Sequence, residues 1–545
     1  MENIILKHAL LNAIQYNGKA NENAVLGKVL SEVPEARKNV ELVRKSITKI
    51  VAKVNKMKPE EQQKLIKGFK VEKVEKKERE GLPPLTDAVD KKVVMRLAPF
   101  PSGPLHIGNA KQFIINDWYV KHYGGKLILF IDDTMGSMEK QIVKDAYDLI
   151  PEGLTWLGIK YDKKIYYKSD RLDIYYKYAE ELIKKDKAYV CECGLNELRE
   201  LRAQKKECIH RQRSVDENLK FWNDMLKGKY KEGEVTLRIK TDMNHPNPAF
   251  RDRVLFRVSD RVHPRVKNKY KVWPLLEFSW AVDDHLCGIT HILRGKDLMM
   301  ESEMERYIWD IFGWKHPVII HTGKFMIDGV NLSKSKAQHE VASGEYSGWD
   351  DPRTWSLQSL KRRGFKPEAI RNFIISFGVT EHEANVSVDK LYSENRKLID
   401  SKSERYFFVS DPVEITLNKI PARSAKAPLF PGKRKFRKIP VTKKIYVDKI
   451  DFVANREKEV RLMHLCNIDL DKKAKFTGKT MKDIPKIHWV SSKHVKIKIV
   501  LDNGKTIEGL AEPAVAKVKP NQMVQFERLF FVRADKKNLF YYAHK

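Results

Sequence analysis

The feature that points most directly to chemistry is a histidine and a glycine at the expected start of a helix, His106 and Gly108. Residues 93–97 are apolar enough for a buried strand, and the prolines and glycine of residues 98–105 turn the chain after it. The first turn of a helix offers N–H groups and a positive dipole end to phosphate, and glycine lets a nucleotide approach the backbone closely. We therefore expect ATP contacts from Pro99, Ser102, Gly103, His106, Gly108 and Asn109.

The elements around this segment suit a nucleotide-binding fold. Helical spacing of apolar residues continues to the Gly124-Gly125 pair, and residues 127–130 form a second expected strand. Strand, loop, helix and strand make half of a doubly wound fold, in which ligands lie beyond the carboxyl ends of strands. A capped or packed helix start without a ligand is the alternative, and this context argues against it.

A second segment, far downstream, places a lysine between two serines, Ser333, Lys334 and Ser335. When a carboxylate attacks the α-phosphate of ATP, negative charge builds up on the phosphates, and an ammonium group together with Mg²⁺ stabilises it. We predict that Lys334 and His106 are the catalytic residues and that both serines contact ATP. A solvated basic loop is the alternative in a chain so rich in lysine.

Both segments resemble the signatures of a known family. The stretch 96–108, RLAPFPSGPLHIG, is similar to the first signature of class I aminoacyl-tRNA synthetases of the glutamyl/glutaminyl subgroup, with Asn109 where a second histidine is common. The downstream segment resembles the second signature, with Asn331 in place of its usual first lysine. Residues 273–297 are similar to the core of the glutamyl members, and the C-terminal half to their archaeal and eukaryotic type. The resemblance implies ATP-dependent activation of an amino acid and its transfer to tRNA.

The resemblance also indicates an amino-acid pocket made by Arg96, Asp132 and Arg294. A guanidinium at residue 294 can pair bidentately with the γ-carboxylate of L-glutamate, whereas the amide of glutamine would leave donors and charge unmatched. Arg96 would face the substrate, and Asp132 would receive its α-ammonium group. Many relatives carry tyrosine where Leu276 stands and a polar residue where Trp280 stands, so those contacts do not transfer.

Three cysteines and a histidine, Cys191, Cys193, Cys208 and His210, have the residue types of a structural zinc site. Because C-x-C is less usual than C-x-x-C, the spacing alone leaves separate buried cysteines as an equal alternative. The resemblance to a zinc-binding element in the acceptor-binding insertion of the family favours Zn²⁺. Five cysteines, with no apolar leader or membrane-spanning run, predict a cytoplasmic protein without disulfides.

The net charge of +32 implies a polyanionic partner. Together with the resemblance, it predicts tRNA(Glu) as the RNA substrate, with tRNA(Gln) as a second candidate, no membrane partner and a monomeric chain. Three other functions compete with this one. They are a glutaminyl-tRNA synthetase, a synthetase-like RNA-binding protein without catalysis, and a simpler nucleotidyltransferase.

The expected architecture is multidomain α/β plus all-β. Helical spacing marks the N-terminus, residues 367–375 read as a helix, and residues 494–500 and 524–533 read as strands. The resemblance assigns these parts to a helical appendage (1–88), a Rossmann core in two halves (89–190 and 271–340), an acceptor-binding insertion (191–270), a helical connection (341–395) and β-barrel anticodon-binding domains (396–545). The charged run 71–80 is expected to be a solvated helix or linker.

Overall fold

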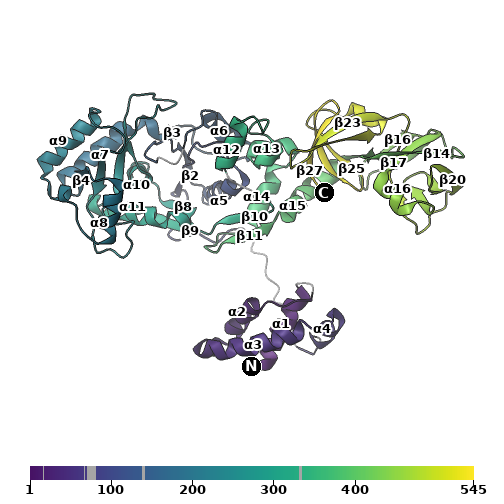
Figure 1. Cartoon of the computed structure of the whole chain (residues 1–545), viewed down its shortest axis with the longest axis horizontal. Coiled ribbons are helices and arrows are strands. Elements are labelled where there is room, and N and C mark those ends of the chain that lie inside the picture. Colours follow the sequence, from purple (N-terminus) through teal and green to yellow (C-terminus); the bar gives the residue numbers. More distant parts are fainter. Residues whose placement is uncertain (16–17, 67, 70–80, 138–140, 331–333) are drawn as a thin grey trace. The chain divides into compact units, whose positions relative to one another are not determined.

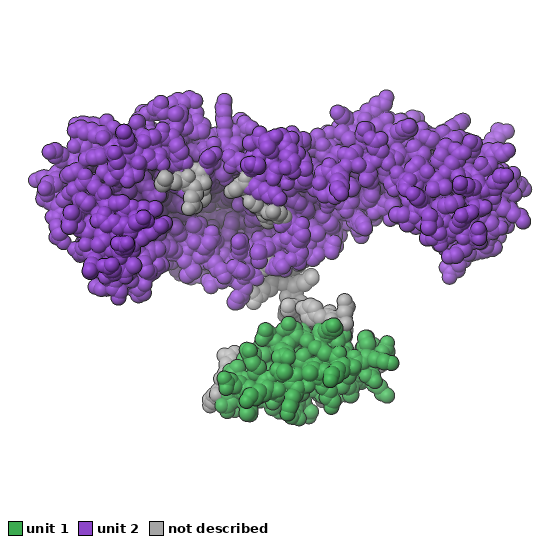
Figure 2. All heavy atoms as spheres, viewed as in Figure 1, with its two compact units in different colours: residues 1–80 green, residues 81–545 purple. Residues whose placement is uncertain are grey.

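The structure is a computed structural model that describes residues 1–15, 18–66, 68–69, 81–137, 141–330 and 334–545. It contains two compact units, Met1–Glu80 and Gly81–Lys545, which are coloured separately in Figure 2. The run 71–80, expected to be a helix or linker, lies outside the described residues. Within the described part, no helix combines the length and the apolar character needed to cross a membrane.

The first unit is helical (Figure 1), as the helical spacing of its apolar residues predicts. Its helices are α1 (Glu2–Gln15), α2 (Glu22–Glu32), α3 (Val40–Val54) and α4 (Pro59–Ile66), with a 3₁₀ turn at Pro34–Asn39. Their apolar faces share one core. The buried side chain of Gln62 fixes α4 to that core, because its amide donates to the carbonyls of Val54 and Gly18, both at 2.9 Å.

The second unit begins with a parallel sheet whose five strands lie in the order β3–β2–β1–β8–β9. Strands β1 (Val94–Leu97), β2 (Lys126–Ile131) and β3 (Ile165–Tyr167) pair in parallel, as do β8 (His291–Gly295) and β9 (Val318–Thr322). Thr290 joins the two groups, because its N–H donates to the carbonyl of Val94 at 2.9 Å and its hydroxyl accepts from the Val94 N–H at 2.9 Å. These five strands follow the order of a doubly wound fold, in which ligand sites lie at the carboxyl ends.

Helices connect these strands and pack against the sheet, and the predicted first strand, helix and second strand are all present. The helices are α5 (Ile107–His122), α6 (Ala146–Trp156), α7 (Leu172–Lys184), α10 (Leu276–Leu286) and α11 (Met299–Phe312). Two residues after β9 begins β10 (Phe325–Asp328), which pairs in parallel with β11 (Ala384–Ser387). These elements place α5, α10 and α11 around the carboxyl ends of β1, β2 and β8.

Between the two halves of this sheet lies an antiparallel sheet with its own helices. It contains β4 (Ala188–Cys191), β5 (Thr236–Ile239), β6 (Val254–Val258) and β7 (Val272–Pro274), with α8 (Leu195–Ala203) and α9 (Val215–Leu226) between β4 and β5. Its outer strands extend a few residues beyond the expected limits 191 and 270, because β4 and β7 continue directly from the elements of the surrounding core.

Four helices and two larger sheets complete the chain. The helices are α12 (Lys334–Ala342), α13 (Leu357–Arg363), α14 (Pro367–Ile375) and α15 (Val388–Ile399), and α14 has the predicted bounds. One seven-stranded sheet contains β12 (Glu404–Tyr406), β25 (Met523–Phe526), β26 (Phe530–Lys536), β27 (Leu539–His544), β23 (Val495–Val500), β24 (Thr506–Ala511) and β13 (Phe408–Val409). The other seven-stranded sheet contains β21 (Lys486–Ile487), β18 (Glu459–Leu462), β19 (Cys466–Asp469), β20 (Lys473–Gly478), β14 (Pro412–Leu417), β17 (Lys444–Asp448) and β22 (Trp489–Ser491). The same part of the chain also forms a hairpin of β15 (Ser424–Pro428) and β16 (Phe436–Pro440) and the helix α16 (Lys449–Asn455).

One strand prediction is wrong. Residues 524–533 form a hairpin of β25 and β26, in which Phe526 pairs with Phe530, and not one continuous strand. The turn places Arg528 at a φ of 67°, a conformation that glycine or asparagine usually occupies. No glycine or proline marks this turn, so the apolar alternation conceals it.

The link through Thr290 predicts that the hydroxyl, and not the shape, of this side chain holds β1 to β8. In Thr290→Val the Val94 N–H loses its partner, so the free energy of unfolding should fall by about 1–3 kcal/mol, measured by denaturant titration. The matched control is Thr236→Val in β5, because the Thr236 hydroxyl is buried without a partner among the described residues. The control should be neutral or stabilising, and an equal loss in both variants would contradict the role of the Thr290 hydroxyl.

Candidate functional site

A cavity of about 1220 Å³ opens at the carboxyl ends of β1, β2 and β8. Its wall brings together eight of the residues predicted from sequence: Arg96, Pro99, Ser102, His106, Gly108, Asn109, Asp132 and Arg294. The three predicted amino-acid contacts and the first predicted ATP segment therefore share one cavity. The size suits a nucleotide together with an amino acid.

His106 is the N-cap of α5. Its Nδ1 accepts from the Asn109 N–H at 3.3 Å, and the Asn109 side chain accepts from the His106 N–H at 3.4 Å, which closes a capping box. Because Nδ1 is an acceptor in this arrangement, the neutral ring carries its proton on Nε2. Asn109 therefore has a structural role at this position, because it closes the cap of α5.

The sequence suggested that the N–H groups at the start of α5 are open to a ligand. In the structure, some of them already have partners. The Ile107 N–H donates to the carbonyl of Trp355 at 3.3 Å, and the Asn109 N–H is held by His106. The Gly108 N–H has no partner among the described residues. Phosphate binding at this helix start would thus use Gly108 and the dipole, because the neighbouring donors are taken.

Gly103 does not belong to the cavity wall, and its predicted ATP contact stays a prediction. Its φ is 138°, and a Cβ there would lie 2.9 Å from the Trp349 ring. Glycine is required because the turn approaches Trp349 closely. The glycine therefore shapes the loop that carries Pro99 and Ser102.

Of the second predicted segment, Ser333 and the side chains of Lys334 and Ser335 lie outside the described residues. The helix α12 begins at Lys334, and the cavity wall includes Val330 before this segment and Gln338 after it. The ATP-binding and catalytic roles of these three residues remain predictions.

Arg294, near the end of β8, is buried and its guanidinium is already held at one edge. Its two terminal nitrogens donate to the two carboxylate oxygens of Glu305 at 2.8 and 2.9 Å, and one of them also donates to Ser302 at 3.2 Å. Its Nε is buried without a partner among the described residues. The predicted pairing with a substrate carboxylate must therefore use the Nε edge, because Glu305 occupies the other.

Arg96 and Asp132 are also paired before any substrate binds. Arg96 makes a bidentate pair with Asp284 of α10, with a second contact of 2.9 Å. Asp132 accepts from the hydroxyl of Thr134 at 3.1 Å and lies 3.4 Å from the ammonium of Lys168. An incoming α-ammonium group would compete with Lys168 for this carboxylate, a competition that the sequence did not reveal.

Lys168 was missed because its neighbours in sequence carry no motif. It follows β3, is fully buried and donates to the hydroxyl of Ser279 at 2.7 Å. Burial lowers the pKa of its ammonium group, and the Asp132 carboxylate opposes that effect. A lysine directly after a strand of the parallel sheet was the available signal, because it occupies the same edge as Arg96, Asp132 and Arg294.

Each buried cation at this edge has its own carboxylate. For Arg96, burial would lower the pKa, but the nearby Asp284 carboxylate outweighs it and the pKa is raised. Removing one partner of such a pair typically costs about 3–5 kcal/mol, because the other charge is left uncompensated. The cavity wall is therefore built from neutralised pairs, and it presents guanidinium donors in fixed positions.

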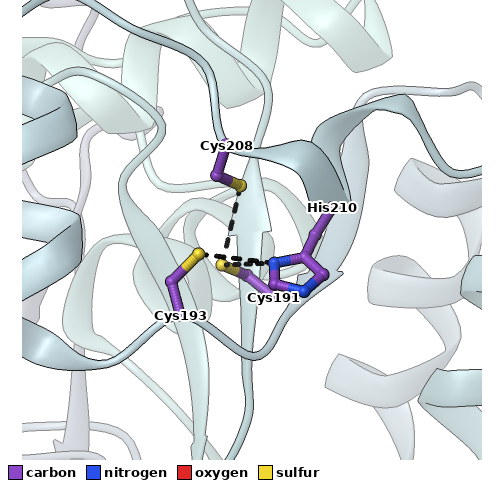
Figure 3. Close-up of side chains that lie close together, drawn as sticks. All are labelled: Cys191, Cys193, Cys208 and His210. Atoms are coloured by element: carbon purple, nitrogen blue, oxygen red, sulfur yellow. Dashed lines mark hydrogen bonds between the residues drawn. The ribbon is translucent and has the colours of Figure 1, made fainter.

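The four predicted metal ligands meet in one cluster (Figure 3). The Sγ atoms of Cys191 and Cys208 are 3.8 Å apart, and the Nδ1 of His210 lies 3.8 Å from the Cys191 Sγ and 3.3 Å from the Cys193 Sγ. All four atoms lie within 4.8 Å of one another. Two sulfurs at about 2.3 Å from a tetrahedral Zn²⁺ would be about 3.8 Å apart, so the residues fit this ion.

The surroundings of the cluster also suit metal-bound thiolates. The buried guanidinium of Arg238 lies 3.5 Å from the sulfurs of both Cys191 and Cys208, and the other ring nitrogen of His210 lies 3.6 Å from Glu192. The hydrogen bond between Cys191 and Cys208 lowers the pKa of Cys208 to about 4 and raises the pKa of Cys191, and burial raises the pKa of Cys193. Outer partners such as Arg238 and Glu192 orient the ligands of metal sites.

The chain matches family models along most of its length. Residues 92–401 match the model of the catalytic domain of tRNA synthetases class I (E and Q), and residues 403–488 and 486–535 match two models of their anti-codon binding domain. The chain is 44% identical to a glutamate–tRNA ligase of Pyrococcus furiosus and 43% identical to one of Methanobrevibacter smithii, each over 100% of both chains. A solved glutamate tRNA ligase from Elizabethkingia meningosepticum overlaps with a TM-score of 0.41 at 20% identity, over 57% of this chain and 71% of that one.

The matched ranges divide the second unit where the structure does, since the catalytic model ends before β12 and the two anti-codon models cover the β-rich part. The matches and the cavity at the strand ends agree, and this chain belongs to the class I tRNA synthetases of the E and Q group.

Proposed function

We propose that this protein is a glutamate–tRNA ligase, which activates L-glutamate with ATP and transfers it to the terminal adenosine of tRNA(Glu). The observation that carries the proposal is Arg294, whose guanidinium lies in the cavity wall with an unpartnered Nε–H among the described residues. A charged donor at this place suits an acidic side chain better than its amide. The full-length likeness to proteins named glutamate–tRNA ligase supports the same substrate.

The reaction has two steps. The α-carboxylate of glutamate attacks the α-phosphate of ATP and pyrophosphate leaves; then a hydroxyl of the terminal adenosine attacks the glutamyl-adenylate and AMP leaves. Neither step needs an enzyme nucleophile, so orientation and charge stabilisation supply the catalysis. Mg²⁺ bound with ATP neutralises part of the phosphate charge.

We assign the remaining roles from geometry and resemblance together. The Nε2–H of His106 and the N–H of Gly108 face the triphosphate, and Lys334 meets the charge that develops at the α-phosphate. Arg96 and Asp132 orient the two groups on the α-carbon of glutamate. Pro99, Ser102 and Asn109 from the first segment and Ser333 and Ser335 from the second complete the ATP contacts.

The substrate assignment predicts a strong preference for glutamate in ATP–pyrophosphate exchange with tRNA present. The value of kcat/KM for glutamate should exceed that for glutamine by about 10³-fold or more. Preference for glutamine would show a glutaminyl-tRNA synthetase, and tRNA binding without exchange or charging would show a protein without catalysis. Either result would overturn the proposal.

A second prediction separates the substrate role of Arg294 from its structural role. The variant R294Q/E305Q removes both charges, so no charge is left stranded, and kcat/KM for glutamate should fall by about 10²- to 10³-fold. The matched control is R437Q/E512Q, a pair in the β-rich part with the same side-chain exposures of 4% and 0%. At saturating tRNA the control should keep its KM for glutamate; a similar loss in both variants would assign Arg294 to folding alone.

We propose that Cys191, Cys193, Cys208 and His210 hold a structural Zn²⁺ in the inserted domain. The ligand spacing given above and the outer contacts of Arg238 and Glu192 support it. A bound ion would fix the segment between β4 and α9 by joining the end of β4 to the turn before α9.

This zinc assignment predicts a metal content that can be measured directly. Purified protein should release about one Zn²⁺ per chain on denaturation, detected with a chromogenic chelator, and Cys208→Ser should release less than about a tenth of that and unfold at a lower temperature. Cys287→Ser is the matched control, because Cys287 lies outside the cluster. Equal zinc in both variants, or none in the wild type, would contradict the assignment.

The RNA range is the last part of the proposal. We propose tRNA(Glu) as the principal substrate and tRNA(Gln) as a second one, on the strength of the archaeal relatives' likeness alone. We further propose a cytoplasmic monomer, on the strength of its few cysteines and its resemblance to the family. Charging assays with each purified tRNA, and the mass of the protein in solution, test these points separately.

A further inference from the structure

Two buried hydrogen-bond donors at the cavity have no partner among the described residues, the Nε–H of Arg294 and the indole Nε1–H of Trp280. Trp280 is 6% exposed and Arg294 is 5% exposed, and both belong to the cavity wall. A buried donor without an acceptor is unfavourable in a folded protein unless something else satisfies it. Both donors therefore point to a ligand.

The indole ring of Trp280 is surrounded by cations. The guanidinium carbons of Arg96 and Arg294 lie 4.7 and 4.8 Å from its centroid, and the ammonium of Lys168 lies 5.0 Å from it. Cations favour the negative face of an aromatic ring, whereas the N–H lies on its positive edge. Because the cations lie over the faces of the ring, its N–H edge remains available to a hydrogen-bond acceptor.

The chemistry of the two donors selects the kind of ligand. An indole N–H and a guanidinium N–H can only donate, and an ionised carboxylate can only accept. An amide would turn its own NH₂ group toward donors if it occupied the same place. From α10 the cavity wall includes only Leu276 and Trp280, and leucine has no polar group, so the indole is the donor that this helix contributes.

We propose that Trp280 is a substrate-binding residue that determines specificity: its Nε1–H and the Nε–H of Arg294 together bind the side-chain carboxylate of the amino acid. The Arg294 guanidinium carbon lies 4.8 Å from the Trp280 centroid, so the two side chains are direct neighbours in the cavity wall. This inference rests on the proposed function, and it adds a second, uncharged contact to the one assigned to Arg294. The ring also packs against Arg96, which faces the α-carbon of the substrate, and against Lys168, which pairs with Asp132.

The test compares variants that remove an indole N–H. Trp280→Phe keeps an aromatic face for the cations but has no edge N–H, so the KM for glutamate in the exchange assay should rise about 10- to 100-fold. The KM for ATP should stay within about twofold. The matched control is Trp222→Phe, because the Trp222 N–H is also buried and unpartnered among the described residues but lies outside the cavity wall. The control should keep both KM values.

A binding measurement on the unaltered protein avoids any question of folding. With ¹⁵N-labelled tryptophan, the indole resonance that is lost in Trp280→Phe should move on saturation with L-glutamate, and the one lost in Trp222→Phe should not. An unmoved Trp280 resonance in an enzyme that charges tRNA with glutamate would overturn the inference and leave the proposed function intact. Equal increases of both KM values in Trp280→Phe would likewise reject direct contact in favour of packing. A wild-type protein that does not use glutamate would instead overturn the proposed function.

Discussion

Buried cations at the carboxyl ends of the parallel strands must be neutralised, and this requirement determines which helices pack around the cavity. Four neighbouring strands of the parallel sheet end in or next to charged residues, Arg96, Asp132, Lys168 and Arg294, and all are buried. A buried charge without a partner would be too costly to keep, so carboxylates must come from other elements. Asp284 of α10 and Glu305 of α11 supply them, and this fixes where both helices pack.

These ion pairs also hold the guanidinium groups of the site in fixed positions before any substrate binds. Glu305 holds both terminal nitrogens of Arg294 and leaves the Nε–H without a partner among the described residues, so the direction of the remaining donor is set in advance. A fixed donor has little conformational entropy left to lose on binding. A glutamine amide would meet the same fixed donors with an NH₂ group that cannot accept from them.

The local parts of this arrangement could be predicted from the sequence. The proline-rich turn before His106, the helix after it and the helix 367–375 are marked by residues close together in the chain, and the structure places them as predicted. The pairs of Arg96 with Asp284 and of Asp132 with Lys168 could not be predicted, because they join residues far apart whose proximity depends on the order of the strands. The hairpin at Arg528 is local, but the sequence did not predict it, because its turn carries none of the usual turn residues.

The same electrostatic constraint operates in the inserted domain, where sulfur replaces carboxylate. Cys191, Cys193 and Cys208 are all buried, and three thiolates there would repel one another strongly. Arg238, itself buried, lies against two of the sulfurs, but one guanidinium cannot balance three negative charges. The proposed Zn²⁺ supplies two more positive charges, and with Arg238 it would make the cluster neutral. The guanidinium and the metal would therefore neutralise the thiolates together, and Arg238 would stabilise the site without binding the metal.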